Sequence, residues 1–185
     1  MRNRALPWII GACLVVGAGA LVALTPDDDA LVAPIERRGA MDETVSSRAL
    51  VATAVEARFA QTVETDDGWS AEGNWLVVTV TVSAPETEID ASIRLATLAI
   101  GDRVFQASER PTASLVGTPL RVGIDTVGML AFELPADVDS GTAELRLTPD
   151  YYTAELDDLV VIALPLDGIA REDTVEITRS GLVTP

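Results

Sequence analysis

The stretch that most constrains the fold is residues 73–82, GNWLVVTVTV, where aliphatic and β-branched residues dominate. Successive side chains of a β-strand point to opposite faces of the sheet, and these residue types favour strands. Every second residue from Leu76 to Val82 is aliphatic, so we expect this face to point into a core. Trp75 begins the opposite face. The stretch therefore predicts a long strand of a sheet with at least one covered side.

Shorter apolar or alternating runs, separated by turn signals, extend this pattern along the chain. They are residues 49–59, 93–100, 103–107, 119–124, 127–134, 143–147, 159–164 and 175–178. The run 49–59 also suits a helix, because alanine and glutamate are frequent in it. Gly101-Asp102 indicates a hairpin turn. In 119–124, Leu120, Val122 and Ile124 would share one strand face. The pattern predicts an all-β fold, an antiparallel immunoglobulin-like β-sandwich of 7–9 strands.

An apolar segment precedes these runs. Residues 5–24, ALPWIIGACLVVGAGALVAL, carry no charge and as a helix would extend about 30 Å, the thickness of a bilayer core. Arg2 and Arg4 come before it, which predicts a cytoplasmic N-terminus. We expect one N-terminal transmembrane helix, an uncleaved signal anchor, in a single-pass protein of the cell membrane with residues 26–185 extracytoplasmic. Cleavage near Ala18-Gly19-Ala20 and lipidation of Cys13 remain alternatives.

The expected organisation has five parts. They are a cytoplasmic tip at 1–4, a transmembrane signal anchor at 5–25, a tether at 26–42, an extracytoplasmic β-sandwich at 43–168 and a C-terminal tail at 169–185 with a possible edge strand. The tether mixes proline, glycine and charged residues. The sandwich is long enough for one core and too short for two domains.

Composition excludes several classes of chemistry. The chain has 13 basic residues, all arginine, against 29 acidic ones, with no histidine and a formal charge of −16. Eleven arginines and every acid lie beyond residue 25, so the exported part carries −18. The missing lysine and histidine exclude Ser-His-Asp triads, Schiff bases, His-ligated metals and P-loops. The single cysteine permits no intrachain disulfide. Strong negative charge disfavours nucleic-acid binding. We expect no cofactor and no enzymatic activity.

Three stretches carry a family resemblance: residues 73–82, residues 98–105 (LAIGDRVF) and residues 128–135 (GMLAFELP). They resemble the DUF4352-type extracytoplasmic domains, which are related to the secreted immunoprotective antigen sandwiches of actinobacteria. The likeness covers roughly residues 44–165, and Ser83-Ala84-Pro85 stands where that family has an asparagine. It implies an immunoglobulin-like sandwich outside a membrane, with binding or accessory roles and no catalytic residues.

Few residues stand out as sites. Asp137 and Asp139 lie in a sequence, DVDSG, that faintly resembles the first half of a calcium loop, although a turn between strands explains it as well. Trp69, Tyr151 and Tyr152 could supply an aromatic surface for a partner, because aromatic residues are enriched where proteins bind one another.

Three functions remain open at this point. The first is a membrane-anchored binding or accessory domain of the bacterial cell envelope, serving an unknown protein partner such as a membrane transporter or an envelope-assembly complex. The second is a surface sensor that binds a ligand or Ca²⁺. The third is a carboxylate-dependent hydrolase, which we expect least because chance pairs among 29 acids mean little.

Overall fold

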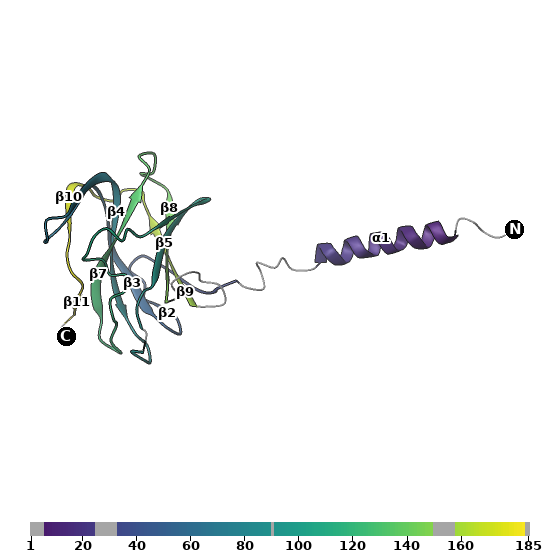
Figure 1. The fold of residues 1–185 in the computed structure, drawn as a ribbon, viewed down its shortest axis with the longest axis horizontal. Helices are drawn as coiled ribbons and strands as arrows, with labels where there is room; N and C mark the ends of the chain where they lie inside the picture. Colours follow the sequence, from purple (N-terminus) through teal and green to yellow (C-terminus); the bar gives the residue numbers. More distant parts are fainter. Residues whose placement is uncertain (1–5, 25–32, 90, 150–157, 184–185) are drawn as a thin grey trace. The chain divides into compact units, whose positions relative to one another are not determined.

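The computed structural model describes residues 6–24, 33–89, 91–149 and 158–183, and the chain divides into two compact units, Met1–Ala33 and Pro34–Pro185 (Figure 1). In the first unit a single helix is described, α1 (Leu6–Leu24). Within the described ranges, no helix meets the length and apolarity required to cross a membrane. The transmembrane helix expected over residues 5–25 is therefore not supported.

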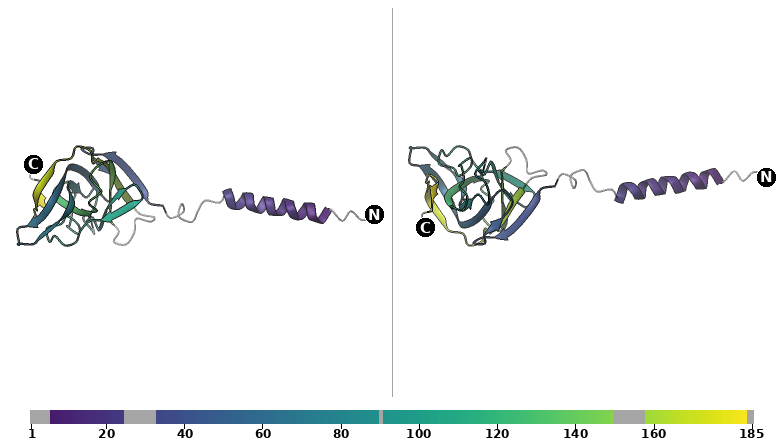
Figure 2. Two further views of the ribbon diagram at one scale, coloured as in Figure 1. Left: turned by 90° about the horizontal axis from the view of Figure 1, so that it is seen from above. Right: turned by 90° about the horizontal axis from the view of Figure 1, so that it is seen from below.

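The second unit is a β-sandwich of two sheets that curl around a shared core (Figure 2). The first sheet has the order β1-β9-β8-β5-β6. Its strands are β1 (Ile35–Ala40), β9 (Asp158–Pro165), β8 (Thr142–Thr148), β5 (Leu95–Ile100) and β6 (Arg103–Gln106). The second sheet has the order β10-β3-β4-β7-β11, with β2 paired to β3. Its strands are β10 (Arg171–Ile177), β3 (Val51–Thr65), β4 (Ser70–Ser83), β7 (Thr126–Leu134), β11 (Gly181–Leu182) and β2 (Val45–Ser46).

The main core lies between the two sheets. The even-numbered residues of β4 from Leu76 to Val82 are fully buried in it, which confirms the aliphatic face predicted from the sequence. Phe59 and Phe132 add aromatic bulk from the neighbouring strands of the same sheet. The residues 49–59, for which a helix competed, lie mostly in β3, because pairing with β4 over the length of the hairpin outweighs local helix propensity.

A second, smaller apolar cluster lies on the opposite face of the second sheet. It contains Trp75 and Val77 of β4, with side chains from β3, β7, β10 and the β6–β7 connection packed around them. Trp75 has no exposed surface. This sheet is therefore covered on both faces. Successive side chains of β4 enter two different apolar clusters, whereas in many antiparallel sheets one face is exposed to solvent.

Two outer strands correct the prediction of an antiparallel sheet. β1 pairs parallel to β9, and β10 pairs parallel to β3. β1 lies within the expected tether, and β10 occupies seven residues of the expected tail. Both cover the edge of a long strand whose peptide groups would otherwise be exposed, which is the physical reason for their pairing. With them, the described residues form eleven strands rather than 7–9.

The run 119–124 is the other departure. It forms only isolated bridges, Ala84 with Val122 and Arg121 with Ile124, instead of a continuous strand. Gly123 has a φ of +67°, a conformation that turns the chain and that glycine adopts at little cost. Leu120 is buried, whereas Val122 and Ile124 remain exposed. The shared strand face predicted for these three residues is therefore wrong.

Candidate binding surfaces

A tryptophan–arginine cluster, defined by Trp69, Trp75, Arg110 and Glu133, lies on the outer face of the second sheet. Trp69 packs edge-on against Trp75, with ring centroids 6.4 Å apart and planes at 83°. The guanidinium carbon of Arg110 lies 5.4 Å from the ring centroid of Trp69 and 5.9 Å from that of Trp75. Arg110 also pairs with Glu133 through an Nη1–Oε2 distance of 3.3 Å. The arginine thus covers both rings and stays half exposed.

The burial of Trp75 depends on a small neighbour. A Cβ at Gly73 would lie 3.0 Å from Nε1 of Trp75, so glycine leaves room for the indole edge there. The Nε1 atom is buried and has no hydrogen-bond partner among the described residues. Burial of an indole N–H without a partner is unfavourable, so packing of the ring must stabilise this arrangement.

Asp67 fixes the turn that presents Trp69. Its carboxylate accepts hydrogen bonds from the hydroxyl of Thr65, from the hydroxyl of Thr112 at 2.7 Å and from the backbone N–H of Trp69 at 3.1 Å. These donors, Thr65 first and Thr112 next, stabilise the charged form and lower the pKa of Asp67 to about 2. Thr112 belongs to the β6–β7 connection, so this carboxylate joins the β3–β4 turn to the segment that carries Arg110.

Thr112→Val is expected to raise the pKa of Asp67 toward its ordinary value near 4, because the carboxylate loses a donor. In the wild type the pKa is lower in the folded than in the unfolded chain, so this contact stabilises the fold above about pH 4 and is lost as the pH falls toward 2. A carboxyl NMR titration measures both values. Thr118→Val is the control, since the Thr118 hydroxyl contacts Ser180 instead. An unchanged Asp67 titration in Thr112→Val would contradict the prediction.

The structure gives Asp137 and Asp139 contacts outside this cluster. Asp137 is exposed and pairs with Arg103 at 3.1 Å, and Asp139 accepts a hydrogen bond from the hydroxyl of Ser140. Within the part of the chain that the structure describes, no group of three acidic, cysteine or histidine side chains is placed to hold a metal ion. Tyr151 and Tyr152 lie outside the described residues. Of the predicted partner-binding residues, Trp69 is therefore the one whose surroundings are known.

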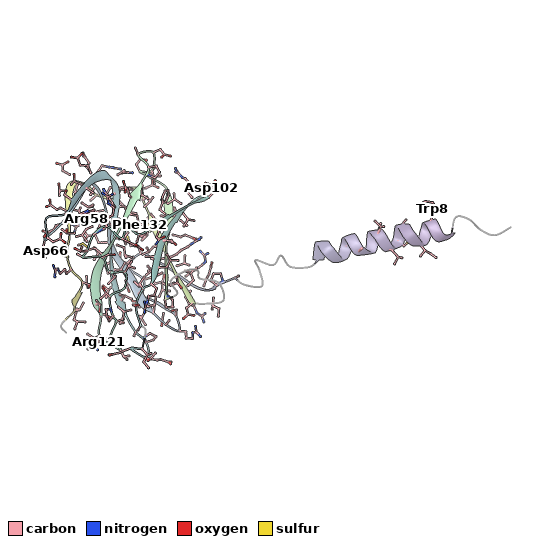
Figure 3. The ribbon with its side chains drawn as sticks, viewed as in Figure 1. Trp8, Arg58, Asp66, Asp102, Arg121 and Phe132 are labelled. Carbon is pink, nitrogen blue, oxygen red and sulfur yellow. The ribbon has the colours of Figure 1, made fainter. Side chains whose placement is uncertain are left out.

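A second surface, which sequence reasoning missed, lies at one end of the sandwich. We call it the apolar end and define it by five exposed aliphatic side chains: Ile89, Val122, Ile124, Leu182 and Val183. Ile89 is the most exposed of them, at 81%. Figure 3 shows Arg121, a neighbour of Val122, at this end and Asp102 of the β5–β6 turn at the other. The missed signal was Gly123, because a glycine inside an alternating run indicates a break in the strand.

Backbone and side-chain contacts join the loops of the apolar end. Glu88, next to Ile89, accepts hydrogen bonds from Nη1 of Arg121 at 2.8 Å and from the backbone N–H of Val122 at 3.3 Å. The N–H of Val183 donates to the carbonyl of Asp125 at 2.8 Å. These hydrogen bonds therefore link the loops that carry the five aliphatic side chains.

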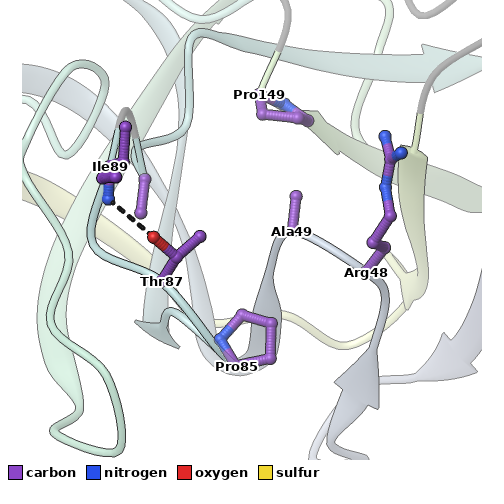
Figure 4. A pocket seen from close by; sticks show the side chains of 7 residues that line it. Arg48, Ala49, Pro85, Thr87, Ile89 and Pro149 are labelled. Atoms are coloured by element: carbon purple, nitrogen blue, oxygen red, sulfur yellow. Dashed lines mark hydrogen bonds between the residues drawn. The ribbon is translucent and has the colours of Figure 1, made fainter.

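Shallow cavities open at this end. One of about 220 Å³ is lined by Arg48, Ala49, Pro85, Thr87, Ile89, Ala91 and Pro149, so it lies between the loops of both sheets (Figure 4). Another, of about 290 Å³, is lined by Gly123, Ile124, Asp125 and Val183. Beside the first cavity, the buried carboxylate of Asp158 accepts a hydrogen bond from the N–H of Ala49 at 2.7 Å, which ties β9 to the start of β3.

Comparison with known protein families gives no match, and no curated protein matches the chain. A crystal structure described as that of a "putative lipoprotein (ycdA)" of Bacillus subtilis aligns with a TM-score of 0.45 and 17% sequence identity. The alignment covers 69% of this chain and 39% of the other. The fold is therefore defined by the two sheets of this chain and the register of their strands.

Proposed function

We propose that this chain is an extracytoplasmic binding or accessory domain of a bacterial cell envelope, which acts by holding a protein partner and not by catalysis. The apolar N-terminal segment supports export and attachment to a membrane. The absence of histidine and lysine supports a role without covalent or general-base catalysis by these side chains. Kinship with the DUF4352-type domains is part of the same proposal and rests on the three stretches of sequence.

The observation that carries the proposal is the tryptophan–arginine cluster. Tryptophan and arginine are the residues most enriched among those that dominate binding energy at protein interfaces. Trp69 is half-buried and held in place by Asp67, and Arg110 is held over the ring by Glu133. A surface that is already ordered loses little conformational entropy when a partner binds. We propose a partner in the same membrane, of the transporter or envelope-assembly kind.

Trp69→Ala and Arg110→Ala are each expected to reduce recovery of the partner at least tenfold in crosslinked pull-downs from native membranes. Tenfold corresponds to about 1.4 kcal/mol, within the range of such interface residues. Proteins recovered with the wild type and with each variant are quantified by mass spectrometry.

Arg103→Ala is the matched control. Arg103 is also half exposed, pairs with an acid and lies 5.9 Å from the ring of Phe105, but it belongs to the first sheet. Recovery with this control should equal that of the wild type. If Trp69→Ala and Arg110→Ala recovered as much partner as the wild type, the proposed surface would be wrong. If the wild-type chain were recovered without any partner protein, the proposed function would be wrong.

A further inference from the structure

Exposed aliphatic side chains are unevenly distributed over the sandwich. Five of them form the apolar end. Among the other described residues of the sandwich, three large apolar side chains have more than a third of their surface exposed: Ile35, Val55 and Val104. Exposed apolar side chains gathered at one end of a domain are typical of a contact with another protein or with lipid. Removing apolar surface from water is favourable by about 25 cal/mol per Å². Covering these side chains with another apolar surface therefore lowers the free energy.

The chain enters the sandwich at this same end. β1 begins at Ile35, whose register partner Asp158 accepts the hydrogen bond from Ala49. Ala49 lines the cavity that Ile89 also lines. The first residue of the first strand and the apolar end are therefore on the same side of the molecule.

A short connection links this entry point to the apolar N-terminal segment. Residues 25–34 lie between the end of α1 and the start of β1. Ten residues span at most about 36 Å. Residues 5–24 are uncharged, and the described side chains of α1 are exposed, including Trp8 at 82%. Transfer of such an uncharged, apolar segment from water to lipid is favourable, whether or not the segment crosses the bilayer. With the segment in lipid, the length of this connection limits the distance between the lipid surface and the start of β1.

We infer that the apolar end docks on the lipid surface to which the N-terminal segment is attached, with Ile89 and Ile124 entering the interface. This rests on the membrane attachment in the proposed function. Tethering makes the docking intramolecular, so a modest apolar surface suffices. Because residues 26–185 carry −18, a neutral lipid surface suits the sandwich better than an anionic one. The tryptophan–arginine cluster is built from other segments of the chain and is left for a partner.

The test places the photocrosslinker benzoylphenylalanine at position 89 or 124 of the full chain, reconstituted into phosphatidylcholine vesicles. Position 104 is the matched control, because Val104 is 58% exposed and lies beside the turn at the opposite end. We expect lipid adducts at 89 and 124 to exceed those at 104 at least fivefold. Ile124→Asp should reduce adducts at 89, and vesicles with a high content of phosphatidylglycerol should reduce them at low salt.

The other outcomes separate the alternatives. Crosslinks from positions 89 and 124 to a second copy of the chain would overturn lipid docking in favour of self-association. Vesicles that carry the chain without an excess of lipid adducts at 89 and 124 would overturn the docking but leave membrane attachment standing. If the chain did not float with the vesicles in a density gradient, both the docking and the membrane attachment would be overturned.

Discussion

Trp75→Ala is expected to lower the free energy of unfolding by about 3–5 kcal/mol, the usual cost of removing a large buried aromatic side chain. Trp75 is fully buried and lies at the centre of the smaller cluster, in contact with Trp69 and beneath Arg110. For a domain of this size, such a loss lowers the melting temperature by roughly 10 °C or more. Urea unfolding followed by circular dichroism measures it, with the slope of the transition compared between the two proteins.

Trp75→Phe separates the contribution of the ring from that of the N–H group. Nε1 has no hydrogen-bond partner among the described residues, so its removal sacrifices no bond. We expect Trp75→Phe to cost about 1–2 kcal/mol, because only part of the ring volume is lost. A loss as large as that of Trp75→Ala would show that the N–H has an important partner. A loss below about 1 kcal/mol for Trp75→Ala would show that the smaller cluster contributes little to stability.

Gly128→Val is expected to destabilise the sandwich by about 1–3 kcal/mol through overpacking. A Cβ on Gly128 would lie 2.7 Å from Cδ1 of the buried Leu115 and 3.1 Å from Cβ of Ser180. The segment that carries Leu115 would have to move away from β7, where the N–H of Leu115 donates to the carbonyl of Met129. Thermal unfolding measures the loss, and hydrogen exchange should increase first at the amide of Leu115.

The same substitution at Gly181 is the control. Gly181 belongs to β11, the strand that pairs with β7, and a Cβ there would meet no atom within 4 Å. Gly181→Val should therefore leave stability within about 0.5 kcal/mol of the wild type. Because valine is favoured over glycine in strands, strand propensity cannot cause a loss. If both variants lost the same stability, the contact with Leu115 would not be the cause.

The candidate surfaces were predictable to different degrees. Trp69 was identifiable as an aromatic residue in a turn, because such turns lie at the surface. Its partner Arg110 was not, since the two residues are 41 positions apart and nothing local connects them. The apolar end was hidden for another reason. Val122 and Ile124 have the spacing of core residues, and only the turn at Gly123 exposes them.

The features of the fold that follow from the sequence are local. The aliphatic face of β4 and the turn at Gly101 follow from side-chain alternation and from glycine, which act between near neighbours in the chain. The tertiary structure alone decided the parallel pairing of β1 with β9 and of β10 with β3, and the burial of Trp75 on the outer face of its sheet. The two parallel pairings join strands more than a hundred residues apart, whose exposed edges become partners only after the sheets have formed. The burial of Trp75 likewise needs side chains from several strands to be brought together.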